Sequence, residues 1–393
     1  MSLTAASPTT FPADWRWHHV HAATSLGDIE RLFPGRFDLS GLDAAGIDAA
    51  AAAYGMRAPP YYLDLAAAAD PADPIWRLAV PSPLELHTTP DEREDPIGDE
   101  RHDLHPLPAL TRRYVDRVLL YPTPTCSVHC RHCFRKRLVG NAEYAVSEAD
   151  LDAAVEWIAA RPEIHEVILT GGDPLTLSDD KLLALLRRLD ALPHVWSLRL
   201  HTRMPVVNPF RITDELAAGL GSLSTPVVVV AHFNHAVEVT ERAALGVRTL
   251  LVHGIPMLNQ SVLLAGLNDD VATHRALLWA LVRARIRPYA LHHADLVPGT
   301  GHLRTSLATG RALLTALRGT LPGHALPHYL LDLPGGHGKV PVGPDALARD
   351  DMPRDDLARQ DLAGDAPPSA ADAEAFDVRG PDGRRHRYPP GPA

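Results

Sequence analysis

Three cysteines, the only ones in the chain, lie within eight residues of one another: Cys126, Cys130 and Cys133. Their C-x3-C-x2-C spacing can supply thiolates to three irons of a [4Fe-4S] cluster, whereas a cluster used only for electron transfer usually takes four thiolates. The fourth iron would then be open to a small molecule. The spacing therefore predicts a cluster that takes part in chemistry on a substrate.

Two other uses of these cysteines fit the sequence less well. A structural zinc site would complete its ligands with His129 or His132. Zinc sites usually pair two short knuckles a dozen or more residues apart, and no second Cys or His pair lies at that distance. A disulfide framework is not supported by an odd number of cysteines in one cluster, which instead indicates a reducing cytosol.

Lys339 is the second residue with a chemically suggestive setting, because the glycines of residues 335–338 allow a tight backbone turn before it. It does not match a phosphate-binding P-loop, since only two residues separate the outer glycines and Val340 follows the lysine. One interpretation is an ordinary surface lysine beside a glycine turn. The other is a Schiff-base lysine that holds pyridoxal phosphate (PLP), with Arg113 and Arg117 as cations for the phosphate.

The composition limits the class of partner. The 393 residues carry a formal charge of -10, with 46% hydrophobic and 22% charged residues, which is ordinary for a soluble globular protein. A negative net charge argues against nonspecific nucleic-acid binding, so we expect a small-molecule substrate. The sequence has no apolar run of about 18 residues and no signal-peptide pattern. We therefore expect a cytoplasmic protein with no membrane partner.

Alternating strand-like and helix-like segments must position these residues. The predicted strands are residues 117–121, 166–170, 197–201, 227–232, 249–252 and 288–292, and the predicted helices between them are 148–161, 179–192, 214–220 and 271–285. This repeat indicates a parallel α/β layout with right-handed crossovers. Periodicity alone fits an open sheet as well as a barrel. The cysteine loop follows the first strand and a Gly171-Gly172-Asp173 turn follows the second, which favours a partial barrel with chemistry at its strand ends.

The pattern divides the chain into three parts. Residues 1–105 are predicted to be mainly helical, residues 106–345 to form the barrel, and residues 346–393 to form a C-terminal extension. Within the extension, residues 347–373 are rich in Asp, Ala, Pro and Arg and are predicted to be poorly ordered. Residues 376–388 are predicted to form a hairpin around Pro-Asp-Gly at 381–383.

Together these segments resemble lysine 2,3-aminomutase, a family of radical S-adenosylmethionine (SAM) enzymes that also use PLP. The resemblance extends over roughly residues 15–342. It includes Cys-Arg-His-Cys-Phe-Arg-Lys-Arg at the cluster, Thr-Gly-Gly-Asp-Pro-Leu after it, and Pro-Gly-Gly-His-Gly-Lys ending at Lys339. It implies a radical SAM partial (β/α)6 barrel and an isomerase. The implied reaction moves the 2-amino group of an amino acid to C3 and regenerates SAM.

The resemblance also assigns residues to three cofactors. The three cysteines would hold a [4Fe-4S] cluster whose open iron chelates SAM, and Lys339 would form a Schiff base with PLP. The other implied cofactor-binding residues are Arg113, Tyr114 and Arg117 for PLP, and Gly171, Gly172, Asp173 and Gln260 for SAM. His232 and Asn234 could contact SAM, or could equally bond local backbone groups at strand ends.

The implied substrate is an amino acid with a cationic side chain. Arg135 matches the family's arginine for the substrate carboxylate, and Asp295 and Asp332 match the two aspartates that bind the distal ammonium of lysine. Each aspartate alone could be an ordinary loop acid or a helix cap. A pair of acids selects a cation, because a desolvated ammonium needs anionic partners. L-lysine, converted to β-lysine, is therefore favoured, with arginine and ornithine as alternatives.

Some residues depart from the family pattern. The chain lacks the cysteines with which lysine aminomutases often bind zinc between subunits, so no zinc is predicted and a homo-oligomer is only one of its possible states. Phe134 lies in the cluster loop, and His337 interrupts the glycine run before the lysine. A radical enzyme that consumes SAM, and a non-enzymatic iron-sulfur protein, are the competing functions. The resemblance also implies a reducing partner of flavodoxin or ferredoxin type.

Overall fold

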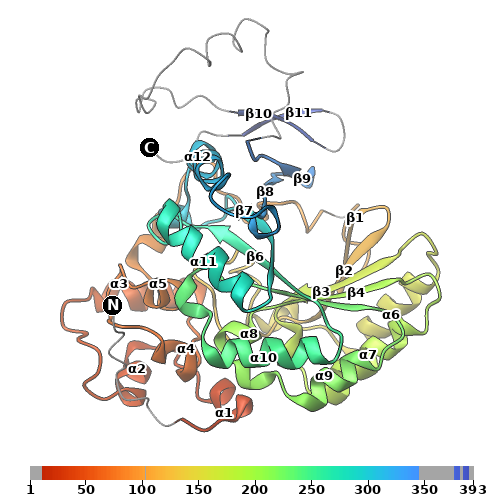
Figure 1. Cartoon of the computed structure of the whole chain (residues 1–393), viewed down its shortest axis with the longest axis horizontal. Helices are drawn as coiled ribbons and strands as arrows, with labels where there is room; N and C mark the ends of the chain where they lie inside the picture. The colour runs from red at the N-terminus through yellow and green to blue at the C-terminus, as the bar shows by residue number, and fades with distance from the viewer. Residues whose placement is uncertain (1–10, 102, 345–375, 381–383, 389–393) are drawn as a thin grey trace, which may run out of the picture.

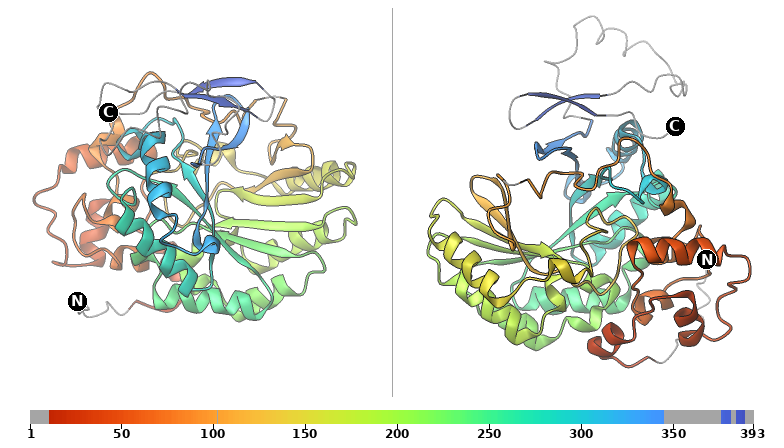
Figure 2. Two further views of the ribbon diagram at one scale, coloured as in Figure 1. Left: turned by 45° about the horizontal axis from the view of Figure 1, so that its top comes forward. Right: turned by 180° about the vertical axis from the view of Figure 1, so that it is seen from behind.

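A single curled sheet forms the centre of the molecule. The computed structural model describes residues 11–101, 103–344, 376–380 and 384–388. Nine strands follow one another across the sheet in chain order, from β1 to β9. The strands β2 to β8 are parallel to their neighbours, whereas β1 and β9 run antiparallel at the two edges. The sheet curls into an incomplete barrel with helices along its outside (Figures 1 and 2).

The strands of this sheet are short. Their bounds are β1 (Leu110–Tyr114), β2 (Arg117–Thr123), β3 (Glu166–Gly171), β4 (Ser197–Thr202), β5 (Val227–Ala231), β6 (Met257–Leu263), β7 (Arg287–His293), β8 (His328–Leu333) and β9 (Gly338–Pro341). The longer helices that cover them are α6 (Glu148–Ala159), α7 (Asp179–Asp190), α9 (Asp214–Gly221), α10 (Glu241–Val252), α11 (Val271–Arg283) and α12 (Leu307–Leu317). A four-residue helix, α8 (Met204–Val207), follows β4. The predicted α/β partial barrel is thus confirmed, with seven parallel strands instead of six.

A capping side chain begins each of these longer covering helices. The caps accept hydrogen bonds from backbone N–H groups of the first turn, which have no partner inside the helix. They are Ser147, Ser178, Thr213, Thr240, Asp270 and Ser306. The boundaries of the barrel helices therefore follow from local sequence.

One predicted strand is wrong. Residues 249–252 form the last turn of α10, where Val252 is exposed, and the strand of this unit is β6. The prediction misses β6 because Asn259 and Ser261 break its apolar pattern. Both side chains are buried beside the loop that follows β5, where they form hydrogen bonds with the backbone of Phe233. The seventh parallel strand, β8, has no counterpart in the prediction.

Alternation along the strands separates an apolar outer face from a polar inner face. Outward residues such as Val118, Val167 and Leu198 pack against the covering helices in one hydrophobic core. The strand register turns the intervening residues toward the barrel interior. Polar members of this inner face include Arg117, Tyr121, Glu166, Arg199, His201, Gln260, His292, Asp332 and Lys339. The barrel interior is therefore suited to a polar or charged ligand.

The N-terminal part is helical and shares this core. Its helices are α1 (Trp15–Val20), α2 (Leu26–Leu32), α3 (Ala44–Tyr54), α4 (Pro60–Asp64) and α5 (Pro74–Ala79). They lie together on one side of the barrel (Figure 1). Their buried side chains belong to the same hydrophobic cluster as those of the strands. None of the helices in the described residues is long and apolar enough to cross a membrane.

A hairpin near the C-terminus packs beside the last strands. Its strands β10 (Phe376–Arg379) and β11 (Arg385–Tyr388) pair antiparallel, which confirms the predicted hairpin. Val378 and Tyr388 join a second hydrophobic cluster with residues of β8, β9 and α12. The predicted poorly ordered segment, residues 347–373, lies outside the described residues.

Candidate active site

The three cysteines lie in the loop that follows β2, at the C-terminal end of the barrel strands. All three are free thiols. Burial raises the pKa values of all three thiols, to about 11 for Cys133. A thiolate therefore forms there only with a compensating cation. Bound iron would provide that compensation.

A buried ionic network anchors this loop to the N-terminal part. Glu85 accepts hydrogen bonds from both Arg131 and Lys136, and the Lys136 Nζ–Glu85 Oε2 distance is 2.8 Å. The Arg131 and Lys136 side chains are only 1% and 2% exposed. Arg131 also donates to the backbone oxygen of Gly55, and Lys136 to that of Gly299. Segments far apart in sequence thus hold the cysteine loop in one conformation.

A second buried cation lies beside the cysteines. Arg203 donates to the Glu238 carboxylate at 2.6 Å and to the Tyr62 hydroxyl at 2.7 Å. Its charge lowers the pKa of the Cys130 thiol, although burial outweighs this and the net shift is upward. A permanent positive charge at this position favours an anionic ligand set such as an iron-bound thiolate.

The structure also shows whether the described side chains could bind a single metal ion. Among residues 11–101, 103–344, 376–380 and 384–388, no three His, Cys, Asp or Glu side chains come close enough to hold a single metal ion. A four-iron cluster spaces its thiolates by the width of the cluster, so this finding concerns single ions such as zinc. The loop, its free thiols and its neighbouring cations fit a cluster bound by Cys126, Cys130 and Cys133.

The glycine turn after β3 packs directly against the cysteine loop. Gly172 N–H donates to Thr123 O at 2.9 Å. A Cβ atom on Gly172 would lie 2.5 Å from Thr125 O, so no other residue fits without moving backbone. Gly171 has φ of +95° and packs on the Tyr121 ring. The turn is therefore held close to the cluster position by its lack of side chains.

Asp173, predicted to contact SAM, uses its carboxylate inside the protein. It accepts hydrogen bonds from Thr202 Oγ1 at 2.7 Å, from the Arg203 N–H at 2.7 Å and from the Leu175 N–H at 3.0 Å. Its side chain thereby joins the ends of β3 and β4. In this structure, Asp173 positions the turn while Gly171 and Gly172 form its surface.

Gln260 projects from β6 into the barrel, as its predicted role requires. Its amide lies 2.5 Å from Nε2 of His232 and 3.3 Å from Nδ1 of His201. Burial, and then nearby Arg203, lowers the pKa of His232 to about 3, so this imidazole is neutral. The Asn234 side-chain oxygen instead accepts a hydrogen bond from the Val262 N–H at 2.8 Å, and its amide nitrogen lies 3.4 Å from Nε2 of His132 in the cysteine loop. Asn234 therefore serves local structure here, the alternative that the sequence left open.

Lys339 lies on β9, after a turn built from glycines. Gly335, Gly336 and Gly338 all have positive φ, between +81° and +89°, which residues with a side chain rarely adopt. The Lys339 side chain points into the open interior of the barrel and is 42% exposed. Its ammonium is paired with Asp332, its partner across the β8–β9 ladder. Burial favours the neutral amine, but Asp332 outweighs it and raises the pKa of Lys339.

A chain of ion pairs connects the predicted PLP and substrate residues. Arg113 donates to Asp332 at 3.1 Å and to Asp99 at 2.5 Å. Arg135 donates to the other oxygen of Asp99 and, at 2.8 Å, to the Tyr121 hydroxyl. Burial of Asp332 is outweighed by Lys339 and Arg113, so the pKa of Asp332 is lowered. The fold thus connects three largely buried side chains, Arg113, Arg135 and Asp332, with the more exposed Lys339 in one network.

Tyr114 and Arg117 approach this network from the β1–β2 hairpin. The Lys339 N–H donates to the Tyr114 hydroxyl at 2.9 Å, which links β9 to β1 across the gap in the barrel. The Arg117 guanidinium lies 5.0 Å from the centre of the Tyr114 ring. Its hydrogen bonds go to Asp116, at 2.9 and 3.2 Å, and its side chain is 41% exposed. Asp116 uses the Nε and Nη2 groups of Arg117, so the Nη1 donors could still bind a phosphate.

Asp295 completes the predicted acid pair from the loop after β7. Burial and then the neighbouring Asp332 raise the pKa of Asp295 to about 8, against the opposing effect of Lys339. Its carboxylate makes no hydrogen bond with the described residues. Asp295 is therefore mostly uncharged at neutral pH and can ionise when a further cation arrives.

These residues fit a bound PLP. The Nε–H of Arg113 is buried and has no hydrogen-bond partner in the described part of the chain, so it can still donate to an anion. Arg113 also carries its positive charge between two acids, which fixes its position. A phosphate accepts such charge-assisted hydrogen bonds. Lys339 lies within the same network and is accessible from the interior.

Two residues of the site are absent from the sequence prediction. Asp99 bridges Arg113 and Arg135, with a side chain that is 7% exposed. In the sequence it is one of several acids in a loop-like run, and nothing local distinguishes it. His292 faces Lys339 from β7. The predicted strand 288–292 contains it, but only the register of the sheet shows that it points inward.

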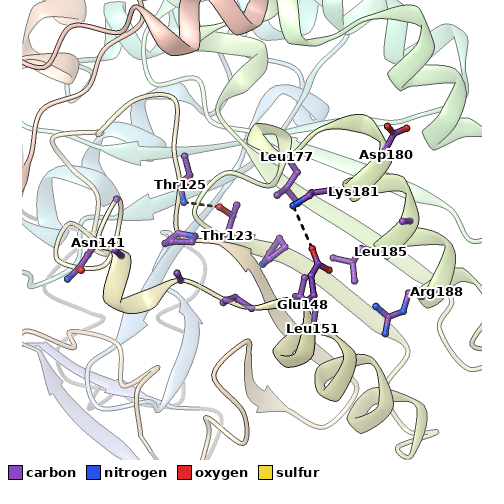
Figure 3. A pocket seen from close by; sticks show the side chains of 17 residues that line it. Thr123, Thr125, Asn141, Glu148, Leu151, Leu177, Asp180, Lys181, Leu185 and Arg188 are labelled. Atoms are coloured by element: carbon purple, nitrogen blue, oxygen red, sulfur yellow. Dashed lines mark hydrogen bonds and ion pairs between the residues drawn. The ribbon is translucent and has the colours of Figure 1, made fainter.

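Two adjoining pockets lie at the cysteine loop. One of about 330 Å³ is lined by Arg135, Tyr121, Asp99, Gly171 and Gly172, and so contains predicted site residues. The other, of about 660 Å³, lies on the outer side of the loop between α6 and α7 (Figure 3). Residues such as Glu148 and Lys181 line the outer pocket, and none of the predicted site residues does. Of these two pockets, only the smaller one is lined by predicted site residues.

Comparisons with known proteins identify the family of the chain. The model of the radical SAM superfamily matches residues 120–277, which include the end of β2, the cysteine loop and β3 to β6. L-lysine 2,3-aminomutase of Acetoanaerobium sticklandii is 40% identical over 332 residues, covering 84% of this chain and 78% of that protein. The enzyme of the same name from Clostridium subterminale is 38% identical over the same shares of the two chains.

Two other matches show that overall similarity does not identify the substrate. Glutamate 2,3-aminomutase of Clostridioides difficile is also 40% identical, over 290 residues that cover 73% of this chain and 67% of that protein. Among solved structures, a radical SAM methyltransferase from Sphaerobacter thermophilus aligns with a TM-score of 0.40 at 16% identity, over 56% of this chain and 68% of that one. That likeness is too distant to carry an argument. The choice between lysine and glutamate therefore depends on the site residues.

Proposed function

Because the chain belongs to the lysine 2,3-aminomutase family of radical SAM enzymes, we propose that it moves the 2-amino group of L-lysine to C3 and so produces β-lysine. One observation carries the choice of reaction and substrate together. A lysine suited to PLP, an arginine suited to a carboxylate and two acids suited to an ammonium converge in the barrel interior. The [4Fe-4S] cluster, SAM and PLP would supply the radical chemistry that removes hydrogen at C3 and moves the nitrogen.

The chain itself holds and orients the reactants. Cys126, Cys130 and Cys133 would bind the cluster, and the Gly171-Gly172 turn and Gln260 would contact SAM from adjacent strand ends. Lys339 would hold PLP, with the free Nε–H of Arg113 donating to its phosphate. Tyr114 accepts a hydrogen bond from the Lys339 N–H and so keeps the backbone of β9 in place. Arg117 would add its Nη1 donors to this phosphate site.

Charge selects the substrate. Arg135 would bind the α-carboxylate, and Asp295 with Asp332 would bind the distal ammonium. The charged Asp332 would repel a carboxylate side chain, and such a side chain offers no cation that favours ionised Asp295, so this pair of acids supports lysine over glutamate. The ammonium of a bound lysine would add a cation beside Asp295, whose pKa is raised by burial and by Asp332.

An anaerobic assay tests the proposal. The protein would be reconstituted with iron and sulfide, supplied with PLP, SAM and dithionite, and incubated separately with L-lysine, L-arginine, L-ornithine and L-glutamate. Conversion of lysine to an isobaric β-amino acid, with no net loss of SAM, is expected. Deoxyadenosine accumulating without an isomer would instead show a SAM-consuming reaction. In the cell, we propose a cytoplasmic enzyme reduced by a flavodoxin- or ferredoxin-type protein, because the open cluster and free thiols need a reducing compartment.

A further inference from the structure

His292 lies on the inner face of β7, directly beside the residues proposed to bind PLP and the substrate ammonium. Its register partner on β8 is Leu330, and Asp332 is two residues further along the same face. Lys339 lies opposite Asp332 on β9. The sheet therefore places the imidazole next to the Asp332–Lys339 pair, in the open interior of the barrel.

His292 is surrounded by charged groups but remains neutral. Burial and then the Lys339 ammonium lower its pKa to about 3, against the opposing effect of Asp332. Its other titratable neighbours are His201 of β4 and His232 at the end of β5, both themselves shifted toward the neutral form. His292 makes no hydrogen bond with the described residues. A neutral imidazole with a free lone pair is a hydrogen-bond acceptor.

The Lys339 side chain shows where a cation binds in this interior. Its ammonium pairs with Asp332, and its charge acts on both Asp295 and His292. A primary ammonium has three N–H donors, and a desolvated ammonium needs an acceptor for each. Asp332 and Asp295 provide two. His292 is the neighbouring group that can provide the third.

We propose that His292 is a specificity-determining residue that accepts the third hydrogen bond of the substrate's distal ammonium. This inference rests on the proposed function and adds to it a preference for primary ammonium groups over guanidinium groups. A guanidinium is planar and presents five donors in a fixed fork, which suits carboxylates side by side. Three acceptors around one point suit an ammonium. The neutral ring adds this acceptor without a further negative charge.

The test uses PLP-loaded, cluster-reconstituted protein without SAM, so that ligands bind but no reaction follows. The change in the PLP absorbance band reports the Kd for L-lysine, L-arginine and L-norleucine, whose side chain lacks the ammonium. His292→Phe, which keeps a ring but removes the acceptor, is expected to weaken lysine binding by roughly 10- to 100-fold, as for a hydrogen bond to a charged group. Norleucine and arginine binding should change less than about threefold, and His292→Asn, which keeps an acceptor, should bind lysine within about threefold of the wild type.

The weakening should be the same at pH 6.5 and pH 8.5, because the imidazole is neutral throughout this range. Lysine binding by His292→Phe within twofold of the wild type would overturn the proposal. So would equal weakening of lysine and norleucine, which would show a structural role. Failure of the proposed function is a separate result: the wild-type protein would then bind norleucine or glutamate at least as tightly as lysine.

Discussion

The acid pair makes lysine binding depend on pH in a predictable direction. Burial and Asp332 raise the pKa of Asp295 to about 8. At pH 7 only about one tenth of the Asp295 carboxyl groups are ionised, and at pH 9 about nine tenths are. Because the ionised form binds the substrate ammonium, lysine affinity should rise about tenfold between these values. The free Lys339 ammonium lowers this pKa, so attachment of Lys339 to PLP would move the transition to pH 8 or above.

The assay follows the PLP absorbance band of reconstituted, SAM-free protein as lysine is added at several pH values. Norleucine is the matched ligand, because it shares the α-amino and carboxylate groups of lysine but has nothing for Asp295 to bind. The ratio of the two Kd values should favour lysine more strongly as pH rises. Asp295→Asn should bind lysine weakly and abolish the change in the ratio. A wild-type ratio that stays constant from pH 7 to pH 9 would refute the assignment of Asp295.

Three further predictions concern the cofactor residues. Lys339→Ala should lose the PLP that borohydride traps on the wild-type protein, whereas replacing the exposed Lys181 should not; equal labelling of both variants would contradict the role of Lys339. Glu85→Gln leaves two buried cations unpaired, so we expect a loss of about 3–5 kcal/mol in unfolding free energy and a lower iron content, measured by denaturant titration and iron analysis. Wild-type values for both would contradict the anchoring network. Gly172→Ala places a Cβ against the backbone of Thr125, so we expect it to lower the unfolding free energy by about 1–3 kcal/mol and to reduce the iron content. An unchanged iron content would show that the turn does not support the cluster.

Local sequence signals single out the three cysteines and Lys339 as candidates, whereas the other cofactor residues came from family resemblance. The spacing of Cys126, Cys130 and Cys133 has chemical meaning without a fold, because a cluster requires thiolates within reach of one another. The glycines before Lys339 similarly predict a turn, and their positive φ values confirm it. The pairing of Asp295 with Asp332 came from family resemblance. In the structure, Asp332 lies near enough to Asp295 to raise the pKa of Asp295.

Other parts of the site depend on contacts that sequence periodicity does not contain. Nothing in the sequence around Asp99 indicates a role, because its partners Arg113 and Arg135 are 22 residues apart in the chain and only the fold brings all three together. The strand β6 was missed because Asn259 is polar, and its side chain is needed to bond the end of the previous unit. The inward direction of His292 likewise follows only from strand register. Residues that act through distant partners are therefore found from the structure.

The most direct measurement is the fate of L-lysine in the anaerobic, fully reconstituted enzyme. Lysine, SAM and deoxyadenosine would be followed together by chiral mass spectrometry, with L-glutamate as the parallel substrate. The account predicts conversion of lysine to β-lysine over many turnovers at constant SAM, with no conversion of glutamate. Glutamate isomerised in preference to lysine would contradict the assignment of Asp295 and Asp332, and SAM consumed once per turnover would contradict the aminomutase reaction itself.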